Sequence, residues 1–298
     1  MSVAGGLPYA IARAHVHQCE ALQIFTKNAS QWRARPLAAE EIAAFRQAAM
    51  DAGIGPIVAH ASYLINIATA NPALRAQSIA ALGEEVDRAE TLGLLGVVLH
   101  PGARLTTPED EAMALVVSAL TQVLNKRPKG KTMILLEHTA GQGSAMGATF
   151  EQIAGMLDGA RNKKRLGVCL DTCHLLASGY DICSEDGYAE TFERFDELIG
   201  FDRLKVFHLN DSKKPCRSRV DRHEHIGQGC IGLEPFRRLV NDPRFAHLPM
   251  LIETEKTEAR GPTKVVLDPL DEMNLKTLRG LRRLSGHARI SYRLPSSP

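Results

Sequence analysis

The sequence predicts a TIM-type (β/α)8 barrel, and three observations lead to this fold class. Apolar strand-like runs alternate with helix-like segments along the chain, which is the pattern of a parallel sheet covered by helices. The length of 298 residues falls in the range of one such barrel. Six of the strand-like runs end at or beside a histidine, aspartate or glutamate, at the end of the barrel where functional side chains collect.

The predicted elements begin with a helix over residues 7–19 and continue as alternating strands and helices. Seven strands are expected, at residues 21–25, 56–60, 96–100, 132–137, 166–171, 204–208 and 249–253. Periodic apolar positions, with start signals such as Asn71-Pro72, predict the helices between them at 38–51, 72–92, 108–125, 149–158, 188–198 and 233–241. A closed barrel needs eight strands. We therefore expect the first strand to be shortened or missing at the N-terminus.

The chain contains no linker, internal repeat or low-complexity tract, so residues 1–298 are expected to form a single domain. Residues 256–298 carry nine Lys/Arg against four Asp/Glu, and roughly the last part, 286–298, is expected to be a flexible basic tail. A basic segment suits a polyanion such as nucleic acid. A solvated terminal helix is the alternative that charge alone leaves open.

The composition also restricts where the protein acts. There is no run of 18 apolar residues and no secretory signal pattern, so no membrane association is expected. The six cysteines form no CxxC pair and no regular framework, which favours reduced thiols. We therefore expect a cytoplasmic protein.

Nine potential metal ligands lie at or just past the ends of six strand-like runs: His60, His100, Glu137, Asp171, His174, His208, Asp221, His223 and Glu253. All C-terminal strand ends of a parallel barrel point at one face, so these side chains are expected to converge. Zinc usually takes about four ligands, so nine of them predict a multinuclear metal site. A glutamate at the end of a buried strand is also costly unless cations neutralise it.

Two short motifs add detail to this site. Asp221 and His223 are two residues apart in an extended segment, so both side chains point the same way and can chelate one ion. Asp171 ends a strand, and the following turn could aim His174 at an adjacent ion. Cys169, Asp171 and Cys173 would share one face of a strand, so we expect the two thiols to pack beside the metal pocket.

The donor set of imidazoles and carboxylates, without a required thiolate, suits Zn²⁺, and Mn²⁺ or Fe²⁺ less specifically. Clustered divalent ions generate hydroxide near neutral pH and stabilise the entering and leaving oxygens in a displacement at phosphorus. The chemistry alone therefore predicts hydrolysis of a phosphate ester.

Longer motifs lie at residues 136–143 (LEHTAGQG), 167–174 (GVCLDTCH), 178–181 (SGYD), 208–213 (HLNDSK), 218–223 (SRVDRH) and 226–229 (IGQG). They resemble the signatures of endonuclease IV, the metal-dependent apurinic/apyrimidinic (AP) endonuclease family of base-excision repair. Further matches at 25–28 (FTKN), 31–33 (QWR) and 60–66 (HASYLIN) extend the resemblance toward the N-terminus. It covers roughly residues 4–256, and long motifs in the right order are highly specific.

The resemblance implies a TIM barrel with three zinc ions, for which manganese or iron are partial substitutes. The first ion would take His60, His100 and Glu137; the second Glu137 as a bridge with Asp171, His208 and Glu253; the third His174, Asp221 and His223. The implied reaction is cleavage of the phosphodiester 5′ to an abasic site, leaving a 3′-hydroxyl and a 5′-deoxyribose phosphate. Zinc-activated hydroxide would attack, oriented by Glu253 or Glu137, and double-stranded DNA with abasic sites would be the partner.

The sequence departs from the family pattern at two places. The usual first strand with its Gly-x-His element is absent before Ala4-Gly5-Gly6. After Asn28, where similar proteins often place a long side chain that enters the duplex, Ala29 and Ser30 are small. The DNA-contacting role would then pass to Gln31, Trp32 and Tyr63, although Trp32 could instead be a packing anchor.

Two other functions are compatible with parts of this pattern. A sugar isomerase or epimerase on a similar barrel also uses histidines and carboxylates at strand ends, but it has no use for a third ion held by His174, Asp221 and His223. A non-catalytic DNA-damage binding protein would not need a complete ligand set. We therefore expect a monomeric DNA repair hydrolase, associated with the nucleoid if its source is a prokaryote.

Overall fold

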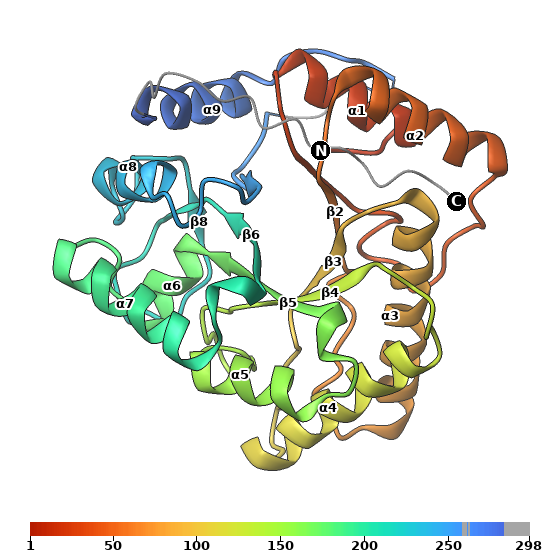
Figure 1. The fold of residues 1–298 in the computed structure, drawn as a ribbon, viewed down its shortest axis with the longest axis vertical. Coiled ribbons are helices and arrows are strands. Elements are labelled where there is room, and N and C mark those ends of the chain that lie inside the picture. The colour runs from red at the N-terminus through yellow and green to blue at the C-terminus, as the bar shows by residue number, and fades with distance from the viewer. Residues whose placement is uncertain (258–260, 262, 283–298) are drawn as a thin grey trace.

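The computed structural model describes residues 1–257, 261 and 263–282. Seven parallel strands form one sheet whose spatial order follows the chain, with helices packed around its outside (Figure 1). The strands are β1 (Leu22–Ile24), β2 (Ile57–His60), β3 (Gly96–Leu99), β4 (Met133–Glu137), β5 (Leu166–Asp171), β6 (Leu204–His208) and β9 (Met250–Leu251). The sheet curls into a nearly closed barrel, so the predicted TIM-barrel class is confirmed.

The barrel sheet has two edges, β1 and β9, which are not paired with each other within the described residues. β9 is only two residues long and pairs with β6 through Phe207–Met250 and His208–Leu251. A separate antiparallel pair, β7 (Asp211–Ser212) with β8 (His223–Glu224), follows β6 and was not predicted. Among the described residues, no further strand closes the seam between β1 and β9, and the Gln23 side chain on β1 contacts Glu253 across it.

The expected helices occur as α1 (Leu7–Val16), α2 (Ala39–Ala52), α3 (Pro72–Leu92), α4 (Glu109–Asn125), α5 (Phe150–Gly159), α7 (Glu185–Leu198) and α8 (Leu233–Asn241). The bounds of α3 follow from local chemistry, because the Asn71 side chain caps the first turn and Gly93 ends the helix in the left-handed region. Two short 3-10 turns, Lys163–Arg165 and Phe201–Arg203, precede β5 and β6. No helix of the described part of the chain is long and apolar enough to cross a membrane.

Two helices were not among the predicted elements, although a terminal helix was the alternative for the basic segment 256–298. α6 (Thr172–Ser178) begins directly after β5, where the Asp171 carboxylate accepts a hydrogen bond from the His174 backbone N–H. Cys173 therefore lies on a helix, and its expected placement on a strand face with Asp171 was wrong. α9 (Pro269–Leu281) is capped by Asp268 and lies beside α8. The expected basic tail, 286–298, lies outside the described residues.

A small apolar layer fills the interior of the barrel, separate from the main core between strands and helices. It consists of Val58, Val98, Leu135, Cys169, Val206 and Leu251, one residue from each of β2, β3, β4, β5, β6 and β9, with Ala21 packed against it. Side chains two residues apart on a strand share a face. The side chain two residues after each member of this layer therefore also points into the barrel, above the layer.

Candidate metal centre

Six of the nine predicted ligands lie two residues after a member of the interior layer: His60, His100, Glu137, Asp171, His208 and Glu253. The layer below is apolar, and the side chains above it are imidazoles and carboxylates. The remaining three, His174, Asp221 and His223, come from α6, the segment after β7, and β8. The structure brings all nine side chains to one end of the barrel. The sets of ligand atoms close enough to share an ion include His60 with His100 and Glu137, then Glu137 with Asp171, His208 and Glu253, and then Asp171 with His174 and His223. Asp221 joins the last set through both of its histidines, so the nine form three overlapping groups.

The first group lies on three adjacent strands. One carboxylate oxygen of Glu137, Oε2, lies 3.3 Å from His60 Nε2 and 3.0 Å from His100 Nε2. Glu137 and His60 are buried, while His100 is about one-third exposed. The two imidazole nitrogens therefore converge on a single carboxylate oxygen, which is the arrangement that a shared cation requires.

The second group uses the other oxygen of the same carboxylate. Glu137 Oε1 lies 3.0 Å from His208 Nδ1, and Glu253 Oε2 lies 3.1 Å from that nitrogen. Asp171 Oδ2 is 4.0 Å from it. Glu137 thus faces both groups, one with each oxygen, so its geometry suits a carboxylate that bridges two ions.

The third group is built from irregular segments. Asp221 contributes one oxygen to each of two histidines, Oδ2 at 3.2 Å from His174 Nε2 and Oδ1 at 3.3 Å from His223 Nε2. Asp171 Oδ2 lies 3.6 Å from His223 Nε2. The Asp221 side chain is 38% exposed, so this side of the centre is the one open to solvent.

Four of the five histidines have their second ring nitrogen against an oxygen acceptor. His60 Nδ1 donates to the Ala61 carbonyl at 2.7 Å and His174 Nδ1 to the His138 carbonyl at 2.8 Å. The other two pairs are His223 Nδ1 with the Glu253 carbonyl, 3.3 Å, and His208 Nε2 with Gln23 Oε1, 2.9 Å. An N–H held in this way leaves the opposite nitrogen as a lone-pair donor, as in metal-binding histidines.

The residues present fit divalent cations. The Nε2 atoms of His174 and His223 are buried and make no hydrogen bond, although carboxylate oxygens lie 3.2–3.6 Å away. Such orphaned buried atoms are explained when an ion lies between them and the carboxylates. Cys169 and Cys173 lie beside the groups, but burial raises the pKa of each thiol to about 12, so both stay protonated at neutral pH.

The charges of the centre depend on one another. Burial alone would lower the pKa of His174, but Asp171 and Asp221 outweigh it and raise that pKa to about 10. His223 behaves in the same way, with its pKa raised to about 9. Burial would raise the pKa of Glu253, but His208 outweighs it and lowers that pKa to about 2. Histidine protons and metal ions therefore compete for the same carboxylates.

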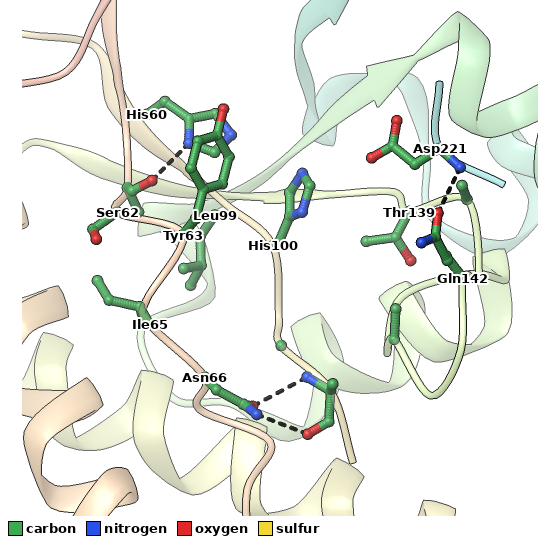
Figure 2. A pocket seen from close by; sticks show the side chains of 15 residues that line it. His60, Ser62, Tyr63, Ile65, Asn66, Leu99, His100, Thr139, Gln142 and Asp221 are labelled. Carbon is green, nitrogen blue, oxygen red and sulfur yellow. Dashed lines mark hydrogen bonds between the residues drawn. The ribbon is translucent and has the colours of Figure 1, made fainter. Parts of the chain in front are cut away.

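A cavity of about 260 Å³ opens beside the first and third groups. Figure 2 shows His100 at its centre, with Tyr63 in front of His60 on one side and Asp221 with Gln142 on the other. The Gln142 side chain accepts a hydrogen bond from the Asp221 backbone N–H at 2.9 Å and so fixes this loop. A ligand in the cavity would contact the metal groups along one wall.

Comparisons with known proteins show which family the chain resembles. A family model described as a xylose isomerase-like TIM barrel matches residues 11–279. The probable endonuclease 4 of Chloroflexus aggregans is 48% identical over 285 residues, 96% of this chain and 97% of that protein. Endonuclease IV from Thermus thermophilus is similar in structure, with a TM-score of 0.81 and 36% identity over 94% of this chain and 96% of that one.

The chain belongs to the endonuclease IV family of enzymes. The structural likeness also extends to a D-tagatose 3-epimerase-like protein, with a TM-score of 0.65 at 19% identity over 88% of this chain and 87% of that one. At that identity the likeness concerns the fold alone. The chain therefore shares a fold with sugar epimerases, and this likeness does not support an epimerase site.

The three predicted DNA-contacting residues of this endonuclease IV-family chain lie in different surroundings. Tyr63 is 65% exposed and its ring centroid lies 5.3 Å from that of His60. Gln31 is exposed, whereas Trp32 is half-buried and packs against the hydrophobic core. Tyr63 and Gln31 are therefore accessible to a large ligand, and Trp32 has a packing role whether or not it also contacts DNA.

Buried polar contacts tie the loops that carry these residues to α3. The Glu85 carboxylate accepts hydrogen bonds from Thr26 Oγ1 at 2.9 Å and from the Ser62 backbone N–H at 3.3 Å. Lys27 Nζ lies 3.7 Å from Glu85 and donates to the Trp32 carbonyl at 2.8 Å. The loops after β1 and β2 are thus held by one buried ionic cluster.

Sequence reasoning missed a basic segment beside the centre. Five exposed cations lie between β7 and β8, in the segment that leads to Asp221: Lys213, Lys214, Arg217, Arg219 and Arg222. Two of them, Arg217 and Arg219, have left-handed backbone with φ of 65° and 52°. Their backbone N–H groups donate to carbonyls of α6. The sequence did indicate this segment, because it has five cations in ten residues. The longer excess of basic residues after residue 256 drew attention away from it.

Proposed function

We propose that the protein is a metal-dependent AP endonuclease of DNA repair. It would cleave the phosphodiester 5′ to an abasic site in double-stranded DNA, leaving a 3′-hydroxyl and a 5′-deoxyribose phosphate. The observation that carries the proposal is the arrangement of nine donors in three overlapping groups, found in a chain 48% identical to a probable endonuclease 4. The proposed cofactor is three zinc ions per chain, with manganese or iron as partial substitutes, and the proposed working state is a monomer.

The ligand assignments of the proposal follow the three groups. His60, His100 and Glu137 would hold the first ion, and Glu137, Asp171, His208 and Glu253 the second. His174, Asp221 and His223 would hold the third. When bound, the ions would acidify water and neutralise charge at the scissile phosphate.

The protein's own residues would then orient the reaction. Glu253 has one oxygen on His208 and the other on Gln23, so its position toward the attacked phosphate is fixed on both sides. Glu137 would hold the first two groups at a constant separation, because each of its oxygens belongs to a different one. Such preorganised charge is typically the largest catalytic contribution at developing negative charge.

Binding of DNA would use the rim around the centre. The exposed cations of segment 213–222 suit backbone phosphates, which supply much of the affinity for nucleic acid. Tyr63 lies beside the cavity and the first metal group, where an aromatic ring can fill the gap left by a nucleotide that leaves the stack. Gln31 and Trp32 would contact the duplex from the neighbouring loop.

The test is cleavage of an end-labelled duplex that contains one abasic site. The protein should cut it once, 5′ to the site, and leave the intact duplex uncut. Glu253→Gln should lower the cleavage rate by about 10²–10³-fold, as for the loss of one preorganised electrostatic contact. Its DNA affinity should stay close to that of the parent, since the basic rim is unchanged. Glu234→Gln, an exposed position on α8, is the matched control and should cleave normally.

Two results would count against the proposal. A metal-loaded protein that leaves abasic duplex uncut would remove the activity itself. Parent-like cleavage by Glu253→Gln would leave the activity in place but remove Glu253 from the mechanism.

A further inference from the structure

Gln23 occupies on β1 the position that a proposed metal ligand occupies on each of six other strands. Ala21 packs against the interior apolar layer, and Gln23 follows it by two residues, as His60 follows Val58 and Glu137 follows Leu135. Its side chain is therefore directed into the metal centre from the strand at the open edge of the sheet. An amide stands where the other strands place an imidazole or a carboxylate.

The Gln23 side chain spans the seam between β1 and β9. Its Nε2 lies 2.5 Å from Glu253 Oε1, and its Oε1 lies 2.9 Å from His208 Nε2. A carboxylate only accepts hydrogen bonds, so Glu253 faces the amide N–H₂ of Gln23. The amide oxygen is then left to accept from the His208 ring, so both contacts have one consistent orientation.

This orientation decides which nitrogen of His208 can bind a metal. With Nε2–H donating to Gln23, the lone pair of the neutral ring is on Nδ1, which lies 3.0 Å from Glu137 and 3.1 Å from Glu253. For His60, His174 and His223 a backbone carbonyl has this role. For His208 the acceptor of the ring N–H is the Gln23 side chain. A substitution can therefore remove this acceptor without altering the backbone.

Gln23 also compensates for the weak local support of Glu253. That residue lies two positions past the end of β9, which has only two residues, and its backbone is held by side chains, with its N–H on Asn210 Oδ1 at 2.7 Å and its carbonyl facing His223 Nδ1 at 3.3 Å. We propose that Gln23 is a positioning residue for the second metal group, which sets the His208 tautomer and holds Glu253 in place across the open seam. The inference rests on the proposed function, because it assigns His208 and Glu253 to one ion.

The experiment compares Gln23→Met with Gln122→Met, the same chemical change on the exposed face of α4. Zinc content is measured by elemental analysis during dialysis against a graded series of chelator. Gln23→Met should retain the first and third ions and bind the second about 10–100-fold more weakly, which is the usual effect of losing such a supporting contact. Gln122→Met should behave as the parent.

Three further measurements separate positioning from a merely structural role. In the cobalt-substituted protein, Gln23→Met should change the visible absorption of one site, because the His208 donor geometry changes. In steady-state cleavage of abasic duplex, kcat should fall while KM stays within about twofold. The metal-free Gln23→Met protein should melt within a few degrees of the metal-free parent. If the Met variant does not fold, Gln23→Leu offers a second apolar replacement for the same series.

The outcomes are distinguishable from failure of the proposed function. Suppose that the parent binds three ions and cleaves abasic duplex. If the Gln23 variants then match its zinc affinity and its kcat, this inference is overturned and the proposed function stands. A lower melting temperature of the metal-free variant with parent-like zinc affinity would also overturn it, since the role would then be structural. A parent without metal or cleavage would instead overturn the proposed function.

Discussion

The two sides of the metal centre are built in different ways. The first group comes from β2, β3 and β4, three neighbouring strands with continuous backbone pairing, in which His60 and Glu137 end β2 and β4 and His100 directly follows β3. The third group comes from α6, an irregular segment and the two-residue β8. There, positions depend on single contacts, such as Gln142 Oε1 with the Asp221 N–H and the Glu253 carbonyl with His223.

The difference indicates a division between a rigid and an adaptable half. Glu137 is fully buried, whereas Asp221 is 38% exposed and lies among the exposed cations of segment 213–222. A site on regular strands holds its geometry more closely than one on loops. We infer that the first group sets the metal framework, and that the third can adjust when a large ligand arrives.

The largest effect is expected at the residue that both strand-borne groups share. Glu137→Gln should lower cleavage by at least about 10³-fold, at the upper end for losing one electrostatic contact. It should also release more than one ion, since His60, His100 and His208 would lose their common carboxylate. Elemental analysis and single-turnover cleavage on the same sample would measure both. A variant with full metal content would show that Glu137 is not the bridge.

A smaller and more selective effect is expected on the loop side. Asp221→Asn should lower the affinity for one ion and reduce cleavage by about 10–100-fold, the range found for single ligand-supporting changes. The other two ions should stay bound, because the ion pairs of Asp221 within the described residues are with His174 and His223, which belong to the third group alone. Loss of all three ions together would show that the two sides act as one unit, and the comparison would fail.

Tyr63 and Trp32 allow a similar comparison outside the metal centre, between an exposed aromatic residue and one that packs on the core. Tyr63→Ala should weaken binding of abasic duplex by about 1–3 kcal/mol, the value of a lost base stack, without changing Tm. Trp32→Ala should lower Tm by several degrees, as a loss of about 2 kcal/mol would, because its side chain packs on the core. Fluorescence anisotropy and thermal melts would distinguish them. If both variants bind DNA as the parent does, neither residue recognises the lesion.

The smallest effect is a pH dependence of the metal-free protein. His174 and His223 have pKa values raised from 6.5 to about 10 and about 9. A raised folded-state pKa contributes stability that is present below the unfolded value and lost as pH rises through the folded one. Tm of the metal-free protein should therefore fall between about pH 7 and pH 9.5. With zinc bound, the ligands carry no such protons, and the decline should be smaller. Parallel declines would contradict the assignment.

Much of this organisation could be predicted from the sequence, and the limits have physical causes. The bounds of β5, β6, α3 and α8 agree with the structure because apolar periodicity and caps act locally. The convergence of strand-end ligands followed from barrel geometry. α6 was missed because seven residues after a strand carry little periodicity, although Asp171 as a cap and Gly179, with φ of 112°, mark its two ends.

Other features required the folded chain. Gln23 was overlooked because a glutamine in a strand is chemically neutral, and only its contact with His208 and Glu253 gives it a role. The buried cluster around Glu85 joins residues far apart in sequence, with Thr26 separated by 59 positions. Trp32 illustrates the same limit, since its half-buried packing could not be separated from DNA contact by sequence alone.

The most direct test of the central claim is a titration of zinc into the metal-free protein, with cleavage of abasic duplex recorded at each addition. Nine donors in three groups predict that activity stays low at one equivalent and reaches its maximum near three, because the second and third groups complete the site. Full activity at a single equivalent, or cleavage that never depends on zinc, manganese or iron, would contradict the three-ion account.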